Sequence, residues 1–264
     1  MTILVEKTTV EWLNFLNNCA DIAGPIASKY FNESILPTQK DDESIVTEGD
    51  LEIEKAIRRY TEVHTPELTV LGEEFGTEKI NAPIKLIVDP IDATSNFARK
   101  IPIFATLLAI EINKEIVAGV VYNPVSKERW EAAKGQGAYY NGQKITVSTV
   151  SNIRDSQAFH GGLFGKEARG NLEQLLAVLA LSKRQRGLGD FLMHMYVAQG
   201  IGEFAIDFGL KPWDLAPLGI ITQEAGGCVT TVEGKPFSHY EGSILTSNGQ
   251  FHNQLVQSYS GTDR

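Results

Sequence analysis

The sequence is best approached from one stretch, Leu86-Ile87-Val88-Asp89-Pro90-Ile91-Asp92-Ala93-Thr94-Ser95-Asn96-Phe97. Its first residues are apolar and β-branched, which predicts the end of a buried strand. Pro90 ends that strand, because proline lacks the N–H that a sheet requires and fixes its own φ. Residues 94–96 carry hydroxyl and amide groups, which favour a helix start. The stretch therefore predicts a buried strand, a tight turn and a helix start in direct succession.

The predicted turn offers ligands for both a metal and an anion. Asp89 and Asp92 bracket it, so their carboxylates and the Ile91 carbonyl are directed toward one point. A hard cation such as Mg²⁺ prefers such oxygen ligands, and free N–H groups at a helix start bind phosphate. An isolated D-P-x-D is more often a strand-ending turn with Asp92 as a cap. The rest of the chain reverses that preference and favours metal-assisted phosphate chemistry.

The composition restricts the class of protein. With 264 residues, of which 42% are hydrophobic and 22% charged, the chain is expected to be globular with a substantial core. A net charge of −9 argues against broad nucleic-acid binding, but bound cations would still admit an anionic substrate. Two cysteines are too few for a disulfide framework. Without a membrane-length segment or a signal-peptide layout at residues 1–7, we expect a cytoplasmic protein that binds no membrane.

Further carboxylates lie at the ends of other predicted elements. Asp50 falls in the first turn of an expected helix, with Thr47 in the capping-box position. Glu73 follows an expected strand at 68–71, and Asp214 lies in the first turn of another helix. Each has a simple structural explanation, because the helix dipole favours Asp50 and Asp214 and Glu73 can lie in a solvated loop. α/β proteins often place functional side chains at strand ends, so these acids taken together favour a functional site over separate structural roles.

The residue pattern predicts two halves, 1–150 and 151–264, that pack as one body. The first half is expected to be α+β, with a helix opened by the capping box Thr8-Thr9-Val10-Glu11, a second helix and an antiparallel sheet. Gly24-Pro25 should kink or restart the first helix. The second half alternates helix and strand, as α/β proteins do. Its expected helices are 167–182, about 190–199, 213–225 and 250–258, and its expected strands include 228–232 and 243–247.

Several motifs share an order along the chain that is typical of one family. The chain has no G-x-S-x-G elbow of a serine hydrolase and no complete P-loop. Its acidic motifs instead resemble those of the inositol monophosphatase-like family of Mg²⁺-dependent phosphatases, over nearly the whole chain. The matching pieces are Val46-Thr47-Glu48-Gly49-Asp50, Gly72-Glu73-Glu74, the stretch 89–97, Gly135-Gln136-Gly137-Ala138-Tyr139-Tyr140-Asn141-Gly142, Trp213-Asp214-Leu215-Ala216 and Glu224-Ala225-Gly226-Gly227. Each piece is weak alone, and their common order carries the resemblance.

The resemblance implies a sugar-phosphatase-like fold, an α/β layered sandwich with an α+β N-terminal half and an α/β C-terminal half. It also implies a homodimer that hydrolyses a small-molecule phosphate monoester with two or three Mg²⁺ ions. The implied ligands are Glu73, Asp89, the Ile91 carbonyl, Asp92 and Asp214, with Asp50 reaching a further, weaker ion.

The resemblance also implies roles in catalysis. The amides of Ala93 and Thr94 would hold the phosphate, next to Ser95. Thr94 with Glu73 or Asp50 would orient a metal-activated water for in-line attack. One position departs from the family, which usually has Gly where this chain has Ala93. Ala would be strained there at φ > 0 but fits as the first residue of a helix, and we expect the second case.

The substrate is expected to be selected in the second half. Arg186-Gly187-Leu188-Gly189-Asp190-Phe191 resembles the R-G-x-G-D-F segment of the histidinol-phosphate phosphatases within this family. An acid at Asp190 suits a substrate that bears an amine and an imidazole, and it can also cap the following helix. Asp207 lies where family members place an acid against the leaving group, with Glu203 as the alternative. The residues implied to bind substrate are Asp92, Ala93, Thr94, Ser95, Arg186, Gly189, Asp190 and Asp207.

The sequence therefore favours a histidinol-phosphatase that acts on L-histidinol phosphate, in histidine biosynthesis. Inositol 1-phosphate, or a related sugar or nucleotide phosphate, is the alternative substrate. Two alternatives of another class are a catalytically weak regulatory binding protein and a metal- and phosphate-binding module without turnover. The complete set of carboxylates argues against both. Release of phosphate from a generic phosphomonoester with Mg²⁺ would separate an enzyme from either.

Overall fold

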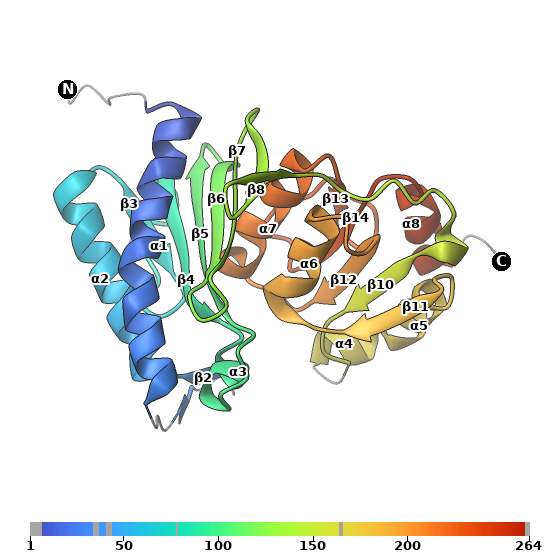
Figure 1. Ribbon diagram of the computed structural model, residues 1–264, viewed down its shortest axis with the longest axis horizontal. Helices are drawn as coiled ribbons and strands as arrows, with labels where there is room; N and C mark the ends of the chain where they lie inside the picture. Colours follow the sequence, from blue (N-terminus) through green and yellow to red (C-terminus); the bar gives the residue numbers. More distant parts are fainter. Residues whose placement is uncertain (1–6, 34–36, 41–43, 78, 164–165, 262–264) are drawn as a thin grey trace.

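Layers of helices and sheets alternate across the molecule, as the computed structural model shows (Figure 1). The structure describes residues 7–33, 37–40, 44–77, 79–163 and 166–261. The N-terminal segment in which no signal-peptide layout is expected lies outside these ranges, apart from residue 7. The predicted α/β layered sandwich is confirmed.

The first half contains a long, seven-stranded sheet. Its elements are α1 (Thr9–Asn32), β1 (Thr38–Gln39), β2 (Ile45–Val46), α2 (Glu48–His64), β3 (Thr69–Gly72), β4 (Ile84–Asp92), α3 (Thr94–Ala98), β5 (Ala105–Ile112), β6 (Glu115–Asn123), β7 (Glu128–Ala133), β8 (Gly137–Tyr140) and β9 (Gln143–Ile145). The sheet follows the order β3-β4-β5-β6-β7-β8-β9, and β1 pairs with β2 separately. β3 is parallel to β4, and the other neighbouring pairs are antiparallel. The expected antiparallel sheet is present, with one parallel strand at its edge.

Both long helices of the first half begin where the sequence predicts. Thr8 and Glu11 form a capping box at the start of α1, and Thr47 and Asp50 form one at the start of α2. Of the predicted kink or restart at Gly24-Pro25, the restart is wrong, because α1 is one helix that continues through Pro25. Packing of the apolar face of α1 in the core offsets the hydrogen bond that proline removes.

The second half contains a five-stranded sheet. Its elements are a 3-10 turn (Ile153–Asp155), β10 (Gln157–His160), α4 (Lys166–Gly170), α5 (Leu172–Leu179), β11 (Arg184–Gly187), α6 (Asp190–Ala198), β12 (Phe204–Phe208), α7 (Pro212–Glu224), β13 (Cys228–Thr230), β14 (Ser243–Ser247) and α8 (His252–Ser260). The order is β11-β10-β12-β14-β13, with β10 parallel to β11 and β12 and the remaining pairs antiparallel. The expected single helix at 167–182 is wrong, because it is divided into α4 and α5 at Asn171.

One helical layer joins the two sheets. α1 and α2 cover the outer face of the long sheet, α6 and α7 lie between the sheets, and α5 and α8 cover the far face of the second sheet (Figure 1). Trp130 and Leu107 of the long sheet share a core cluster with Leu215 of α7 and Ile244 of β14. α7 packs closely on β6, since a Cβ at Gly119 would lie 2.8 Å from Ile220 Cγ2 and 3.0 Å from the backbone of α7.

The chain passes from the seven-stranded sheet to the five-stranded sheet between β9 and β10. Because α7 of the second half contributes to a core on the first sheet, the boundary 1–150 and 151–264 stays a proposal. Among the described residues, no helix is both long enough and apolar enough to cross a membrane.

Candidate active site

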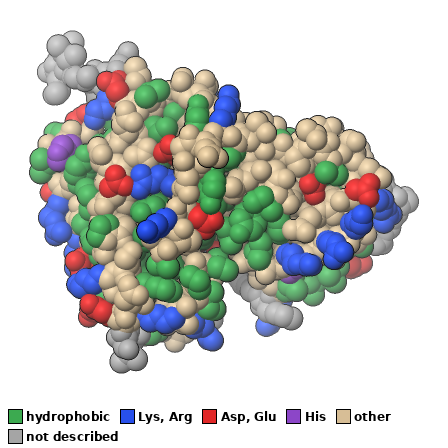
Figure 2. Space-filling view, viewed as in Figure 1, with side chains coloured by type: hydrophobic (Ala, Val, Ile, Leu, Met, Phe, Trp, Pro, Cys, Tyr) green, Lys and Arg blue, Asp and Glu red, His purple; other side chains and the backbone are tan. Residues whose placement is uncertain are grey.

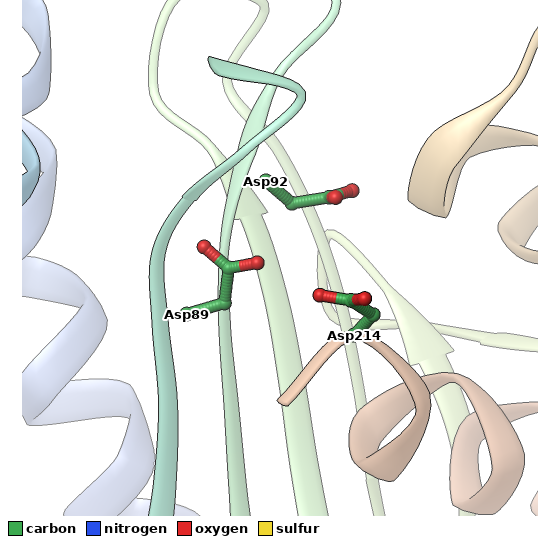
Figure 3. A group of neighbouring side chains, drawn as sticks. All are labelled: Asp89, Asp92 and Asp214. Atoms are coloured by element: carbon green, nitrogen blue, oxygen red, sulfur yellow. The ribbon is translucent and has the colours of Figure 1, made fainter. Parts of the chain in front are cut away.

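Three aspartates meet where β4 ends and α7 begins. Asp89 and Asp92 come from β4 and Asp214 from the first turn of α7, and one carboxylate oxygen from each lies within 4.8 Å of the others. Figure 3 shows the three carboxylates facing a common space. The predicted convergence of these aspartates is therefore present in the structure.

A bulge explains how Asp89 and Asp92 reach the same space. Residues three apart on a regular strand face opposite sides of the sheet. Here Asp89 pairs with Leu107 and Asp92 with Ala105, so the register shifts by one residue between them. The extra residue turns the second carboxylate toward the first. The prediction that Pro90 ends the strand is wrong, because β4 continues through Pro90 to Asp92. Pro90 lies within the register shift, where its missing N–H costs no regular ladder bond.

Two more acids lie beside the three aspartates. Asp50 is fully buried in the first turn of α2, and one of its carboxylate oxygens accepts the Thr47 N–H at 2.8 Å. Glu73 lies in the turn after β3, and its Oε1 accepts a hydrogen bond from Lys40 Nζ at 3.0 Å. The charge of Glu73 contributes to raising the pKa of Asp89, Asp50 and Asp214. The five predicted acids thus form one electrostatic unit.

Burial and mutual repulsion make these carboxylates costly to ionise. Burial raises the pKa of Asp89 well above its ordinary value, and the charge of Glu73 adds to the effect. Burial and then the charge of Asp190 raise the pKa of Asp92. Burial raises the pKa of Asp50 and of Asp214 to about 7.

The donor set fits a divalent cation. Within the described part of the chain, Asp50 Oδ1 and Asp89 Oδ1 are buried and have no hydrogen-bond partner. A buried anionic oxygen without a partner carries a large desolvation cost, which a bound cation would remove. Carboxylates supply the hard oxygen ligands that Mg²⁺ takes.

The turn that follows Asp92 presents backbone donors. α3 begins at Thr94, and its first internal N–H bonds run from Asn96 and Phe97 to the Ala93 carbonyl. The N–H groups of Thr94 and Ser95 precede those bonds and can reach an anion, as at other helix starts. These three turn residues, Ala93 to Ser95, line a cavity of about 670 Å³ together with Glu73 and Asp190.

The expectation for Ala93 is wrong. Ala93 is the N-cap of α3, not its first residue, and it adopts φ 66° and ψ 44°, in the left-handed region. The bulge before it and the helix start after it leave one residue to reverse the chain direction, and that residue requires φ > 0. The Thr94 hydroxyl then donates to the Ile91 carbonyl at 2.9 Å, so this implied ligand already has one partner.

The start of α6 reaches the same site from the second half. The Phe191 N–H donates to Asp92 Oδ2 at 2.9 Å, and Asn96 Nδ2 donates to Asp190 Oδ2 at 3.5 Å. Asp190 is the first residue of α6 with φ 50°, and Gly189 is the N-cap, so the expectation that Asp190 caps this helix is wrong. Burial raises the pKa of Asp190 to about 6.

The other residues predicted to select the substrate lie in three different environments. Asp207 on β12 is buried, and burial followed by the charges of Asp190 and Asp214 raises its pKa to about 7. Glu203 instead accepts the Gln157 N–H at 2.6 Å, as a connection between neighbouring strands. Arg186 lies on the exposed edge strand β11, where its guanidinium donates to the adjacent backbone.

Some contacts of the site were not predicted from sequence. Lys40 follows β1 and forms ion pairs with both Glu73 and Glu74. Burial would lower the pKa of Lys40, but its bonds to Glu74 and the charge of Glu73 raise it. Nothing local to residue 40 signals this pairing, because its partners are more than thirty positions away.

Comparisons with known proteins agree with this geometry. A family model described as the inositol monophosphatase family matches residues 9–262. A histidinol-phosphatase of Streptomyces coelicolor is 36% identical over 82% of this chain and 84% of its own. An inositol monophosphatase of Dictyostelium discoideum is 29% identical over 95% of this chain and 96% of its own. The crystal structure of the extragenic suppressor protein suhB from Bartonella henselae has a TM-score of 0.87 and 29% identity, over 93% of this chain and 97% of that chain.

Proposed function

The chain belongs to the inositol monophosphatase family and is a phosphatase of that family, and we propose that it hydrolyses L-histidinol phosphate to L-histidinol and phosphate. One observation carries the choice of substrate. Two buried acids from the second half, Asp190 and Asp207, lie within electrostatic reach of each other and of the aspartate cluster. Such acids would pair with an amine and an imidazole in the leaving group.

We propose that Mg²⁺ is held by Glu73, Asp89, the Ile91 carbonyl, Asp92 and Asp214, with Asp50 toward a further ion and two or three ions in all. When bound, Mg²⁺ supplies charge stabilisation for the phosphoryl oxygens and a water of lowered pKa. The uncatalysed reaction is very slow, so both contributions are needed.

The chain's own residues would orient the reactants. The N–H groups at Ala93 and the start of α3 would bind the phosphoryl oxygens, as the unpaired donors of a helix start do. The Thr94 hydroxyl donates a hydrogen bond to the Ile91 carbonyl, so its oxygen can accept a hydrogen bond from an attacking water and orient it. Glu73 or Asp50 would take the proton that this water loses. Asp190 and Asp207 would hold the leaving group on the far side.

Inositol 1-phosphate is the second candidate substrate. The likeness to the Dictyostelium inositol monophosphatase extends over nearly the full length of both chains. A polyol leaving group carries no positive charge, so it would gain less from two acids than an amine would. The presence of all five predicted acids, three of which converge at Asp89, Asp92 and Asp214, disfavours the alternative of a binding protein without turnover.

The deciding experiment compares phosphate release from the two esters with Mg²⁺. We expect a higher kcat/KM for L-histidinol phosphate in the native protein. Asp190→Asn and Asp207→Asn should each lower that value about tenfold or more and leave the value for inositol 1-phosphate nearly unchanged. Glu67→Gln, at an exposed acid remote from the site, is the matched control. A native preference for inositol 1-phosphate would refute the choice of substrate.

We also propose that the protein is a cytoplasmic homodimer that binds no nucleic acid. Cys19 and Cys228 are both free thiols, as in a reducing compartment. Figure 2 shows Lys and Arg interspersed with Asp and Glu on the face viewed. Such a mixture differs from the one-sided basic surface of nucleic-acid-binding domains. Sedimentation analysis at several concentrations would test the dimer, and a single monomeric species would contradict it.

A further inference from the structure

Glu54 is a buried acid that the proposed reaction does not use. It lies on α2, four residues after Asp50, so both side chains project from the same face of the helix. Its side chain is fully buried, yet it is directed at a loop and away from the cluster of aspartates. Burying a carboxylate is costly unless it is paired and hydrogen-bonded, so its partners indicate its role.

Among the described residues, the hydrogen-bond partners of Glu54 lie in one short turn and at Arg58. Its Oε2 accepts the Glu74 N–H at 2.9 Å, and its Oε1 accepts the Phe75 N–H at 3.3 Å. Arg58, one helical turn further along α2, donates Nε–H to Glu54 Oε1 at 2.9 Å and Nη2–H to the Gly76 carbonyl at 2.6 Å. The pair therefore binds both sides of the turn that carries Glu73.

Other contacts also hold the turn, because the Glu73 N–H donates to the Val88 carbonyl at 3.1 Å and Lys40 forms ion pairs with Glu73 and Glu74. The turn is closed by two backbone bonds between Gly72 and Gly76, and its apolar residue, Phe75, is 45% exposed. Gly72 has no side chain because the carboxylate of Glu54 occupies that space: a Cβ there would lie 2.0 Å from Glu54 Oε1. Glu54 and Arg58 therefore hold the part of the turn that directly follows Glu73, from Glu74 to Gly76.

We propose that Glu54 and Arg58 are positioning residues that fix Glu73 against the aspartate cluster and thereby set the metal affinity of the site. The inference rests on the proposed function, because it requires a metal at Glu73. One helix thus supplies Asp50 directly and aligns Glu73 through its turn. Glu54 and Arg58 would act through the orientation of Glu73, since their hydrogen bonds within the described residues go to each other and to residues 74–76.

The test uses Glu54→Gln, which retains the shape of the side chain. A carboxamide can accept through one oxygen only, so either the Glu74 N–H or the pair of Phe75 and Arg58 faces an NH₂ group. We expect Mg²⁺ affinity, measured by calorimetry without substrate, to fall at least tenfold. Turnover at saturating Mg²⁺ should be close to native, because the ligand itself is still present.

Two further variants separate positioning from general damage. Glu52→Gln, on the same helix, removes the ion pair with Lys29 at 3.8 Å and should leave the Mg²⁺ affinity unchanged. Arg58→Gln removes the guanidinium that pairs with Glu54. Because Arg58 is partly exposed, this variant can still be tested if Glu54→Gln does not fold. Arg58→Gln should weaken Mg²⁺ binding in the same direction.

A double-variant cycle decides whether Glu54 acts through Glu73. In a Glu73→Gln background, adding Glu54→Gln should weaken Mg²⁺ binding by less than twofold. An equal loss in both backgrounds, or native affinity in Glu54→Gln, would overturn the inference. If the affinity changes as expected but the native protein releases no phosphate, only the proposed function fails. A native protein that binds no Mg²⁺ overturns both.

Discussion

Ala93 holds a backbone conformation that its side chain disfavours. Its φ of 66° lies in the left-handed region, where residues other than glycine carry a strain of about 1–3 kcal/mol. The strain falls on the residue that separates the Asp92 carboxylate from the N–H groups of Thr94 and Ser95. It is therefore located where the chain must pass from a metal ligand to a phosphate-binding turn within one residue.

The first prediction concerns this strain. Ala93→Gly should raise the free energy of unfolding by about 1 kcal/mol, since relief of strain exceeds the extra entropy of glycine in the unfolded chain. In a chain of this size that corresponds to a Tm increase of about 2–4 °C. Ala98→Gly, at the end of α3, is the control and should be destabilising. Denaturant unfolding measures both, and a destabilised Ala93→Gly protein would contradict the account.

The second prediction concerns the buried aspartates. Asp92→Asn and Asp214→Asn should each lower turnover by about three orders of magnitude, since the loss of a metal ligand removes several kcal/mol of transition-state stabilisation. The same substitutions remove one of several buried like charges. In the absence of metal they should therefore leave Tm unchanged or higher near neutral pH. Near-native turnover in either variant would refute the assignment of the site.

At the scale of elements, the site depends on how α7 sits on the long sheet. The helix brings Asp214 to the end of β4, and Gly119 of β6 allows it to approach. The third prediction is that Gly119→Ala forces α7 outward. The free energy of unfolding should fall by about 1–3 kcal/mol, as in other overpacked cores, and Mg²⁺ affinity should fall with it.

A substitution elsewhere on the sheet provides the comparison for Gly119→Ala. Ala118→Gly, at the neighbouring residue on the other face of β6, should cost a similar free energy without displacing α7. Unfolding and calorimetric titration on both variants separate the two effects. Equal Mg²⁺ affinities in the Gly119→Ala and Ala118→Gly proteins would show that the packing of α7 on β6 does not determine the position of Asp214.

Element boundaries show what sequence alone can and cannot predict. The capping boxes at Thr8 and Thr47 are local signals, and both helices begin there. β11 is different, because its residues Arg184–Gly187 are polar and exposed, and pairing with β10 makes them a strand. Such an edge strand has no apolar pattern from which it could be predicted.

The same distinction holds for the candidate site. Asp89, Asp92 and Asp214 could be grouped in advance because each lies in a family-like motif, close to the end of a strand or the start of a helix. The left-handed conformation of Ala93 follows from a bulge against β5, and the contact of Lys40 with Glu73 follows from the position of β1 and β2. Both are tertiary consequences, so local residue preferences could not predict them.

At the scale of the whole molecule, the two sheets share one core through α6 and α7. The fourth prediction is therefore a single cooperative unfolding transition, with calorimetric and van't Hoff enthalpies that agree. Because each half loses part of its core without the other, residues 1–150 alone should not form a stable domain. Two resolved transitions, one for each half, would contradict this.

The fifth prediction concerns pH in the metal-free protein. The folded pKa values of Asp50 and Asp214, about 7, exceed the ordinary value of 3.8. The folded state thus binds more protons than the unfolded state between these limits, so stability should fall as pH rises from about 4 to about 7 and then level off. Mg²⁺ requires the ionised forms. The increase in Tm on adding Mg²⁺ should therefore be small below pH 6 and large at pH 8.

Thermal unfolding with Mg²⁺ and with a chelator, across this range of pH, measures the difference directly. The Asp214→Asn protein should lose part of the pH dependence, since it lacks one of the titrating groups. A metal-induced shift that is equal at acidic and alkaline pH would contradict the coupling.

The hydrogen bond from the Phe191 N–H to Asp92 has a consequence for protein engineering. The start of α6, which would recognise the leaving group, is hydrogen-bonded to Asp92, which would bind Mg²⁺. Grafting another relative's recognition segment onto this scaffold should therefore alter the metal requirement along with the choice of ester. Attempts to evolve one property here will have to select for both at once.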